Sequence, residues 1–441
     1  MTEQQTLTIQ EAIDLGVEHH NAGRLPEAEN IYNQILQVEP KQHEALNLLG
    51  VIASQLGKND IAVDLIGRAL AINPDYAEAY YNLGYVLKEQ GKLDDAIASY
   101  QKAIAIQSDY ADAHYNLGIV FQDQGREDYA VASYHTALAI KPDYVSAHNN
   151  LGNAFGRQGK VDDAVASYRM ALTIKPDYAE AHFNLHSLLI DPDDMAVSIK
   201  CVEKAINVDP SNRYYRFILG MLLDYSGNSK KAVTHFNIVE SGVNEDSARL
   251  DAWHYIKSVN NIIPLIIGSS IQAFKLGINA AAEEGLVLEF GVGFGTSVHQ
   301  IAEQVEHMHG FDSFEGLPEA WHKEPKGSYT TKGIIPSVPN NVTLHKGWFE
   351  DTLPSFIEQH QEPIRFMNID CDIYSSTKTI LDLLAKQITH GTVIVFDEYI
   401  GNANWREDEF KAFQEAVVSY GWEYEYLCFS FMTKQVVVRI N

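Results

Sequence analysis

The chain has 441 residues, and its 59 acidic against 33 basic side chains give a formal net charge of −26. This length predicts two or three domains. The acidic excess argues against a nucleic-acid partner, which needs clustered Lys and Arg, and against an anionic membrane surface.

Cysteine usage and the N-terminal residues bear on location. The three cysteines, Cys201, Cys371 and Cys428, are too scattered for a disulfide framework or a zinc site. Residues 1–7 lack the basic start and apolar core of a signal peptide. The most apolar run, residues 261–277, is interrupted by polar residues, Pro and Gly before it reaches the length of a membrane span. We therefore expect a soluble, cytoplasmic protein without membrane insertion.

The first part of the chain repeats itself with a period of 34 residues. Four positions keep this period over seven units, which chance does not explain. They are two glycines, an alanine and a proline: Gly16, Gly50, Gly84, Gly118, Gly152 and Gly220; Gly23, Gly57, Gly91, Gly125, Gly159 and Gly227; Ala28, Ala62, Ala96, Ala130, Ala164 and Ala232; Pro40, Pro74, Pro142, Pro176 and Pro210, with Ser108 in the missing proline slot.

This period and these residue types resemble tetratricopeptide repeats, which are helix-turn-helix units. Each unit buries its apolar face only against its neighbours, so we expect an all-α superhelix with a concave groove that recruits a partner or substrate. The sixth unit is the most irregular, because His186 replaces the glycine and residues 191–194 replace the turn. We expect a distorted turn there. The units span 9–42, 43–76, 77–110, 111–144, 145–178, 179–212 and 213–246.

An asparagine recurs at one position of the first helix in four successive units. The position faces the groove in tetratricopeptide superhelices, and the ladder is similar to that of the O-linked N-acetylglucosamine transferase. It predicts hydrogen bonds to the backbone of a protein or peptide partner. An equally weighted interpretation is that these residues cap or bridge adjacent helices. They are Asn82, Asn116, Asn150 and Asn184.

Residues 247–285 leave the 34-residue period and connect the repeats to the last part of the chain. An amphipathic helix is predicted over 270–284, ending at Gly285. From 286 to 441, apolar runs alternate with helical patterns, which indicates an α/β domain with a mostly parallel sheet. We predict seven strands, the last two an antiparallel pair, at 286–290, 309–312, 341–345, 364–369, 392–396, 424–429 and 435–440.

The first of these strands runs into a turn with three alternating glycines. Gly291, Gly293 and Gly295 let the backbone take unusual torsions and let a ligand approach. Close packing alone is the alternative explanation. A dinucleotide fingerprint would have another glycine where this chain has Thr296.

The segment from Glu289 to Gly295 instead resembles the first motif of class I S-adenosylmethionine-dependent methyltransferases, which have a Rossmann-like sheet. The resemblance implies that Asp312, at the end of the next strand, holds the ribose hydroxyls of the cofactor. Trp348 and Phe349 would flank the adenine, although core packing explains them equally well. The remaining implied cofactor contacts are Ser297, Ser313, Gly347 and Asp370.

Four further motifs extend the resemblance over residues 286–430. They are similar to those of the macrocin O-methyltransferase-like family, which methylates sugars of macrolides and aminocoumarins. The repeats have no counterpart in those enzymes. The motifs are Phe311-Asp-Ser-Phe-Glu-Gly-Leu-Pro, Gly347-Trp-Phe-Glu-Asp-Thr-Leu-Pro, Asp370-Cys-Asp-Ile-Tyr-Ser-Ser-Thr and Phe396-Asp-Glu-Tyr.

Acidic pairs follow two neighbouring predicted strands. Asp370 and Asp372 follow one, Asp397 and Glu398 the next, so four carboxylates should meet at one edge of the sheet. A hard cation such as Mg²⁺ or Mn²⁺ would relieve their repulsion. By resemblance, Asp370, Asp397 and Glu398 are metal ligands and Asp372 is the general base. Glu398 departs from the family's usual aspartate, and capping of the following helices is the alternative role.

The resemblance thus implies a metal-dependent O-methyltransferase that uses S-adenosylmethionine and acts on a sugar or another vicinal diol. Residues 319–340 are interpreted as a lid over the acceptor. Two alternatives remain: a catechol-type O-methyltransferase, and an interaction scaffold with a vestigial methyltransferase domain.

Overall fold

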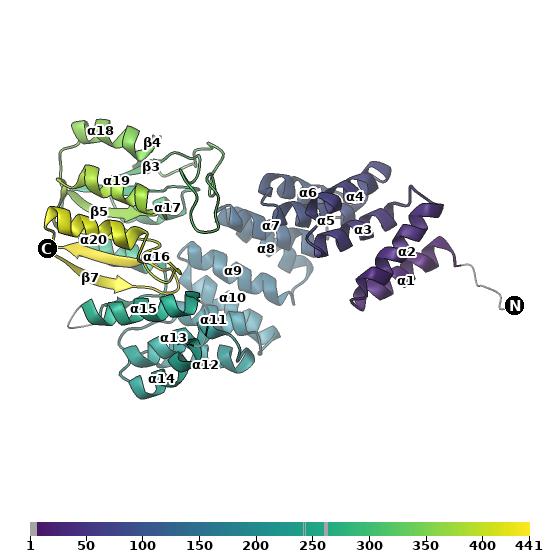
Figure 1. Ribbon diagram of the computed structural model, residues 1–441, viewed down its shortest axis with the longest axis horizontal. Coiled ribbons are helices and arrows are strands. Elements are labelled where there is room, and N and C mark those ends of the chain that lie inside the picture. Colours follow the sequence, from purple (N-terminus) through teal and green to yellow (C-terminus); the bar gives the residue numbers. More distant parts are fainter. Residues whose placement is uncertain (1–6, 241, 243, 260–262) are drawn as a thin grey trace. The chain divides into compact units, whose positions relative to one another are not determined.

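The computed structural model describes residues 7–240, 242, 244–259 and 263–441 (Figure 1). The chain divides into two compact units, Met1–Leu151 and Gly152–Asn441. None of the helices within the described ranges has the length and apolar character that crossing a membrane requires.

The first unit is built from helix pairs at the predicted positions. The recurring glycine allows close packing: a Cβ on Gly84 would lie 2.8 Å from Cε1 of Tyr100 in the partner helix. Gly91, with φ of 71°, ends the first helix of its pair in a left-handed turn that favours glycine. The helices are α1 (Ile9–Asn21), α2 (Leu25–Val38), α3 (His43–Gln55), α4 (Asn59–Ile72), α5 (Ala77–Glu89), α6 (Leu93–Ile106), α7 (Ala111–Asp123) and α8 (Glu127–Ile140).

The helical repeats continue into the second unit, and α9 spans the division between the units. The distorted turn expected in the sixth repeat is confirmed: α11 has 10 residues, whereas the first helix of the preceding repeats has 13. The helices are α9 (Val145–Arg157), α10 (Val161–Ile174), α11 (Ala179–Leu188), α12 (Ala196–Val208), α13 (Arg213–Tyr225), α14 (Ser229–Glu240) and α15 (Asn244–Val259).

The α/β part of the second unit contains one eight-stranded sheet in the order β1-β7-β8-β6-β5-β2-β3-β4. β8 is antiparallel to both β6 and β7, as predicted for the terminal pair. The predicted count of seven strands was wrong, because β1 pairs in parallel with β7 at the sheet edge. The strands are β1 (Leu265–Ile266), β2 (Leu286–Phe290), β3 (Met308–Asp312), β4 (Val342–Lys346), β5 (Ile364–Ile369), β6 (Ile388–Phe396), β7 (Tyr424–Phe429) and β8 (Val436–Ile440).

Helices cover both faces of this sheet (Figure 1). On β6, Val393 and Val395 belong to the apolar cluster of α16 and α17, whereas Ile394 and Phe396 belong to that of α18, α19 and α20. This alternation buries both faces, so a central strand is apolar throughout. The helices are α16 (Ser270–Ala280), α17 (Thr296–Ala302), α18 (Phe349–Gln359), α19 (Tyr374–Leu384) and α20 (Glu409–Tyr420).

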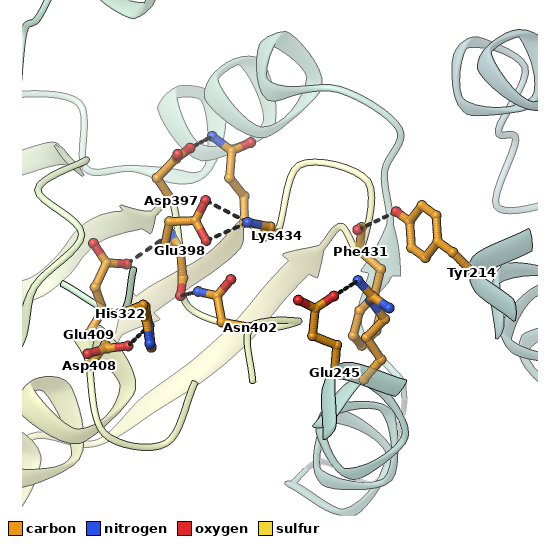
Figure 2. Close-up of polar contacts among 12 residues, drawn as sticks. Tyr214, Glu245, His322, Asp397, Glu398, Asn402, Asp408, Glu409, Phe431 and Lys434 are labelled. Carbon is orange, nitrogen blue, oxygen red and sulfur yellow. Dashed lines mark hydrogen bonds and ion pairs between the residues drawn. The ribbon is translucent and has the colours of Figure 1, made fainter. Parts of the chain in front are cut away.

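Within the second unit, the last repeats and the sheet share one hydrophobic core. Trp253 of α15 is fully buried, and its ring lies 5.8 Å from that of Phe429 on β7. Tyr214 of α13 donates a 2.9 Å hydrogen bond to the carbonyl of Phe431 (Figure 2). One apolar cluster therefore includes residues of α11 to α15 together with residues of β7 and β8.

Candidate functional site

The glycine turn joins β2 to α17 at the carboxyl end of the sheet. Gly291 and Gly293 have φ values of 90° and 52°. A Cβ on Gly291 would lie 1.7 Å from the carbonyl oxygen of Asp370, so only glycine lets the ends of β2 and β5 approach this closely. A Cβ on Gly293 would meet nothing within 4 Å. The turn is therefore packed on one side and open on the other, which fits a bound ligand.

Asp312, at the end of β3, is fixed against this turn. Its Oδ2 accepts a 2.7 Å hydrogen bond from the N–H of Gly293, and its Oδ1 accepts a 2.6 Å bond from the N–H of Phe314. Burial raises the pKa of this carboxyl group. A third backbone donor, Val292, also lowers that pKa in opposition to burial. Asp312 keeps acceptor capacity for a hydroxyl donor, as the resemblance predicts for a ribose.

Glu289 lies fully buried beneath the turn. Ser297 donates a hydrogen bond to its Oε1, and Asn368 donates to the same atom at 3.4 Å. Its Oε2 has no hydrogen-bond partner among the described residues. Burial, with weaker repulsion from Asp312 and Asp397, raises the pKa of Glu289 to about 8. A donor group of the cofactor at Oε2 would stabilise the charged carboxylate, which burial disfavours.

Three other predicted cofactor residues differ in their contacts and in their exposure to solvent. Phe349 packs edge-on against Phe290, with ring centroids 5.6 Å apart, which favours the core-packing interpretation. Ser313 is buried, and its hydroxyl accepts a 3.1 Å hydrogen bond from the N–H of Glu315 in a local turn. Trp348 is half-buried beside Gly347, after β4, and keeps part of its surface exposed to solvent. Trp348 therefore has surface available to a ligand, and Phe349 is half-buried as well.

The acidic pairs follow β5 and β6 and interact electrostatically. Burial, then repulsion from Asp397 and Glu398, raises the pKa of Asp372 to about 7. Burial, then Glu398, raises the pKa of Asp397 to about 7, and the pKa of Asp370 is raised well above its ordinary value. All four acidic side chains are half-buried. The structure thus brings the predicted carboxylates together at the edge that carries the glycine turn.

Three partners of these carboxylates were missed by the sequence analysis. Lys434 donates to both oxygens of Glu398, at 3.0 and 2.9 Å (Figure 2). Gln435 donates to Oδ1 of Asp397 at 2.6 Å. The buried Glu409, at the start of α20, accepts a 3.2 Å hydrogen bond from the N–H of Glu398. No motif marks these residues. In the sequence, Glu409 is an acidic residue in the first turn of a helix, where such residues are common. Lys434 and Gln435 lie in the turn between β7 and β8.

The predicted metal ligands are not assembled as a metal site. Within the described part of the chain, no group of three or more His, Cys, Asp or Glu residues is placed to hold an ion. Glu398 is engaged through both oxygens by Lys434, and one oxygen of Asp397 is engaged by Gln435. The donor set as placed, with Asp370 as its third member, does not fit Mg²⁺ or Mn²⁺.

Strained backbone is concentrated around this edge of the sheet. Among the described residues, every non-glycine residue with positive φ lies in a loop that follows β3, β5 or β7. Such conformations cost about 1–3 kcal/mol each and cluster at functional sites. The residues are Phe314, His322, Tyr329, Lys332, Asp372 and Lys434.

The loop between β3 and β4 covers part of this site. A Cβ on Gly295 would lie 3.4 Å from the ring of Pro336, which places the loop against the glycine turn. Tyr329 is 58% exposed, and burial together with the charges of Asp372, Glu324 and Glu398 raises its pKa to about 12. The loop therefore lies beside both the turn and the carboxylates, where the lid was predicted.

Each asparagine of the predicted ladder donates to a side chain of the preceding repeat. Two donate to a tyrosine hydroxyl and two to an asparagine amide oxygen, which favours the bridging interpretation. The bonds are Asn82 to Asn47 (3.2 Å), Asn116 to Tyr81 (3.2 Å), Asn150 to Tyr115 (3.1 Å) and Asn184 to Asn153 (3.0 Å).

Comparison with protein families matches both parts of the chain. Models of the tetratricopeptide repeat match residues 43–76 and 65–98, and a TPR repeat model matches 84–125, 123–159 and 153–190. A methyltransferase domain model matches residues 288–399. The N-terminal part of the chain therefore carries tetratricopeptide repeats, and the C-terminal part carries a methyltransferase domain. No curated protein matches the chain.

Solved structures resemble parts of the chain. The crystal structure of MamA is 30% identical over 36% of this chain and 94% of its own, with a TM-score of 0.34. A thermophilic TPR protein of Thermus thermophilus, TTC0263, is 26% identical over 41% of this chain and 99% of its own, with a TM-score of 0.35. YrrB, described as a TPR protein with an unusual peptide-binding site, is 18% identical over 42% of this chain and 95% of its own, with a TM-score of 0.36.

Proposed function

We propose that this chain is an S-adenosylmethionine-dependent O-methyltransferase whose repeats recruit a protein partner or the carrier of the acceptor. The observation that supports it most directly is the glycine turn, which is open at Gly293 and has the carboxylate of Asp312 fixed beside it. The half-buried carboxylates of Asp370, Asp372 and Asp397 lie at the same edge of the sheet. In this proposal, the cofactor and the acceptor bind side by side.

Each residue of the site has its own role in the proposed methyl transfer. The bound cofactor supplies an activated methyl group. Asp312 accepts the ribose hydroxyls, and the unpaired Oε2 of Glu289 accepts a donor from the cofactor's amino-acid end. Asp372, on a strained backbone beside Asp397, takes the proton of the acceptor hydroxyl. Orientation of the two reactants supplies most of the rate gain.

The acceptor that we propose is a sugar or another vicinal diol, from the resemblance of the four motifs. An aromatic diol is the alternative, and a panel of sugars and catechols separates the two by which class receives the labelled methyl group. We place the reaction in the cytoplasm, which suits the free thiols of Cys201, Cys371 and Cys428.

Calorimetric titration with S-adenosylmethionine tests the proposal. We expect one cofactor per chain in the wild type. Gly293→Val should weaken binding at least about tenfold, because its side chain enters the open side of the turn at a positive φ. Gly421→Val, at a helix end with φ of 68°, is the matched control for backbone strain and should keep the affinity. A wild type that releases no heat would favour the scaffold alternative.

The partner proposal has a separate test. Asn116 and Asn150 bridge neighbouring repeats. Asn116 already donates to Tyr81 and to the Asp112 carbonyl, so an acceptor role of its Oδ1 is what it can offer a peptide. If the ladder binds a partner, the double variant Asn116→Ala and Asn150→Ala should reduce partner capture from a lysate while the protein stays folded. Unchanged capture would leave only the bridging role.

A further inference from the structure

Lys434 lies in the turn between β7 and β8 and is held there by backbone contacts. Its φ is 58°, a left-handed conformation that costs energy for a lysine. Its carbonyl accepts a 3.3 Å hydrogen bond from the N–H of Ile400. The backbone of this residue is therefore fixed against the segment that follows the Asp397–Glu398 pair.

The ammonium group is directed at Glu398. It lies 3.0 and 2.9 Å from the two carboxylate oxygens, so one lysine engages the whole carboxylate (Figure 2). Glu398 is fixed from the other side as well, since its N–H donates to Glu409 and its carbonyl accepts a 3.1 Å bond from Asn402. Backbone hydrogen bonds therefore constrain the positions of both residues of the ion pair.

The charge of Lys434 also reaches the neighbouring acids. It acts on Asp372 and on Asp397, in opposition to the repulsion among the carboxylates. The Lys434 side chain is 41% exposed and that of Glu398 is 16% exposed, so the pair lies at the border between the carboxylates and solvent. Lys434 therefore stands where a cation that neutralises this group would be expected.

We propose that Lys434 is the built-in cation of this site: its ammonium neutralises Glu398, offsets part of the negative charge of Asp372 and Asp397, and keeps Glu398 from ligating a divalent metal. The site then works without Mg²⁺ or Mn²⁺. Lys434 is a positioning residue in this role, because it acts through Glu398 and the neighbouring acids. The catalytic consequence rests on the function proposed above, whereas the ion-binding consequence does not.

The test measures Mn²⁺ binding to the full chain by the loss of the free-ion signal in electron paramagnetic resonance. We expect the wild type to leave that signal unchanged. Lys434→Met keeps the length of the side chain and removes its charge, so the freed carboxylates should reduce the free-ion signal at a Mn²⁺ concentration at least about tenfold below the highest one at which the wild type leaves it unchanged. Adding Glu398→Gln to Lys434→Met should abolish the gain, and Lys434→Arg should not bind Mn²⁺.

Two controls make the result decisive. Lys378→Met removes a lysine that pairs with Asp382 on α19 and should not change Mn²⁺ binding. Titration with S-adenosylmethionine reports separately whether each variant keeps a folded cofactor site, so failure of the methyltransferase proposal is distinguishable. A wild type that binds one Mn²⁺ per chain overturns the inference. A Lys434→Met variant that folds and gains no Mn²⁺ binding overturns it too, and if that variant does not fold, the wild-type result decides.

Discussion

His186 shows how one residue adapts a repeat. It occupies the slot of the recurring glycine and is fully buried. Its Nδ1–H donates to the carbonyl of Phe183, and its Nε2 has no hydrogen-bond partner among the described residues. Burial of the ring lowers the pKa of His186 to about 4. The folded protein therefore needs this histidine in its neutral form.

This predicts a stability that depends on pH. The unfolded chain protonates His186 near pH 6.5, whereas the folded chain does so only near pH 4, so stability falls as the pH drops from 6.5 toward 4. At pH 5 the loss due to His186 should be about 2 kcal/mol. Urea unfolding at pH 7.5 and pH 5 measures it, with His186→Gln as the non-titrating control. An equal loss in both proteins would contradict the prediction.

At the scale of elements, the pair α11 and α12 differs from the other helix pairs in which helix carries the large side chain. In the other repeats the recurring glycine touches a large side chain of the second helix, as Gly152 touches Tyr168 and Gly220 touches Phe236. In the sixth repeat the large residue is His186 on the first helix, and the corresponding position of the second helix holds the buried Val202. The larger residue is thus on the first helix of this repeat and the smaller one on the second.

A double-mutant cycle tests this exchange. His186→Gly alone should leave a cavity and lower the unfolding free energy by about 2–4 kcal/mol, measured at pH 7.5. Adding Val202→Tyr should recover most of that loss, because it restores the pair found in the fifth repeat. Val202→Tyr alone should overpack the contact and destabilise it by about 1–3 kcal/mol. Additive effects of the two changes would show that the residues do not compensate one another.

At the scale of the molecule, the end of the repeats is part of the core of the methyltransferase domain. The hydroxyl of Tyr255 on α15 lies 3.0 Å from that of Tyr426 on β7, which lies 2.9 Å from that of Tyr399. Arg406 forms a bidentate ion pair with Asp251 of α15, at 2.8 and 3.0 Å. Helix α15 thus supports the segment that follows the acidic pair of β6.

Fragments of the chain should reflect this shared core. Residues 152–441 should fold and bind S-adenosylmethionine with the affinity of the full chain, because they form one compact unit. Residues 247–441 keep most of α15 but lose α11 to α14. This loss exposes Phe431, which packs against Phe217, and removes Asp224, the partner of the Trp253 indole N–H. We expect this shorter fragment to aggregate or to melt at least about 5 °C lower. Equal melting temperatures in thermal denaturation would show that the repeats are dispensable for the domain.

The local patterns of the sequence were sufficient for most of the elements. The 34-residue period predicted the repeat helices because each pair packs only against its neighbours, so spacing along the chain corresponds to position in space. The glycine turn and the acidic pairs were visible because each belongs to one strand end. β1 escaped prediction, since two residues carry no periodicity and only pairing with β7 makes them a strand.

The state of the acidic site was decided by tertiary structure. Glu398 by itself has the chemistry of a metal ligand, and the sequence determined that it follows a buried strand beside Asp397. Lys434 neutralises Glu398, and Gln435 donates a hydrogen bond to Asp397. Both contacts depend on the hairpin that brings β8 beside β6. Charge interactions depend on distance in space, and residues 36 positions apart in the chain leave no local pattern that predicts their contact.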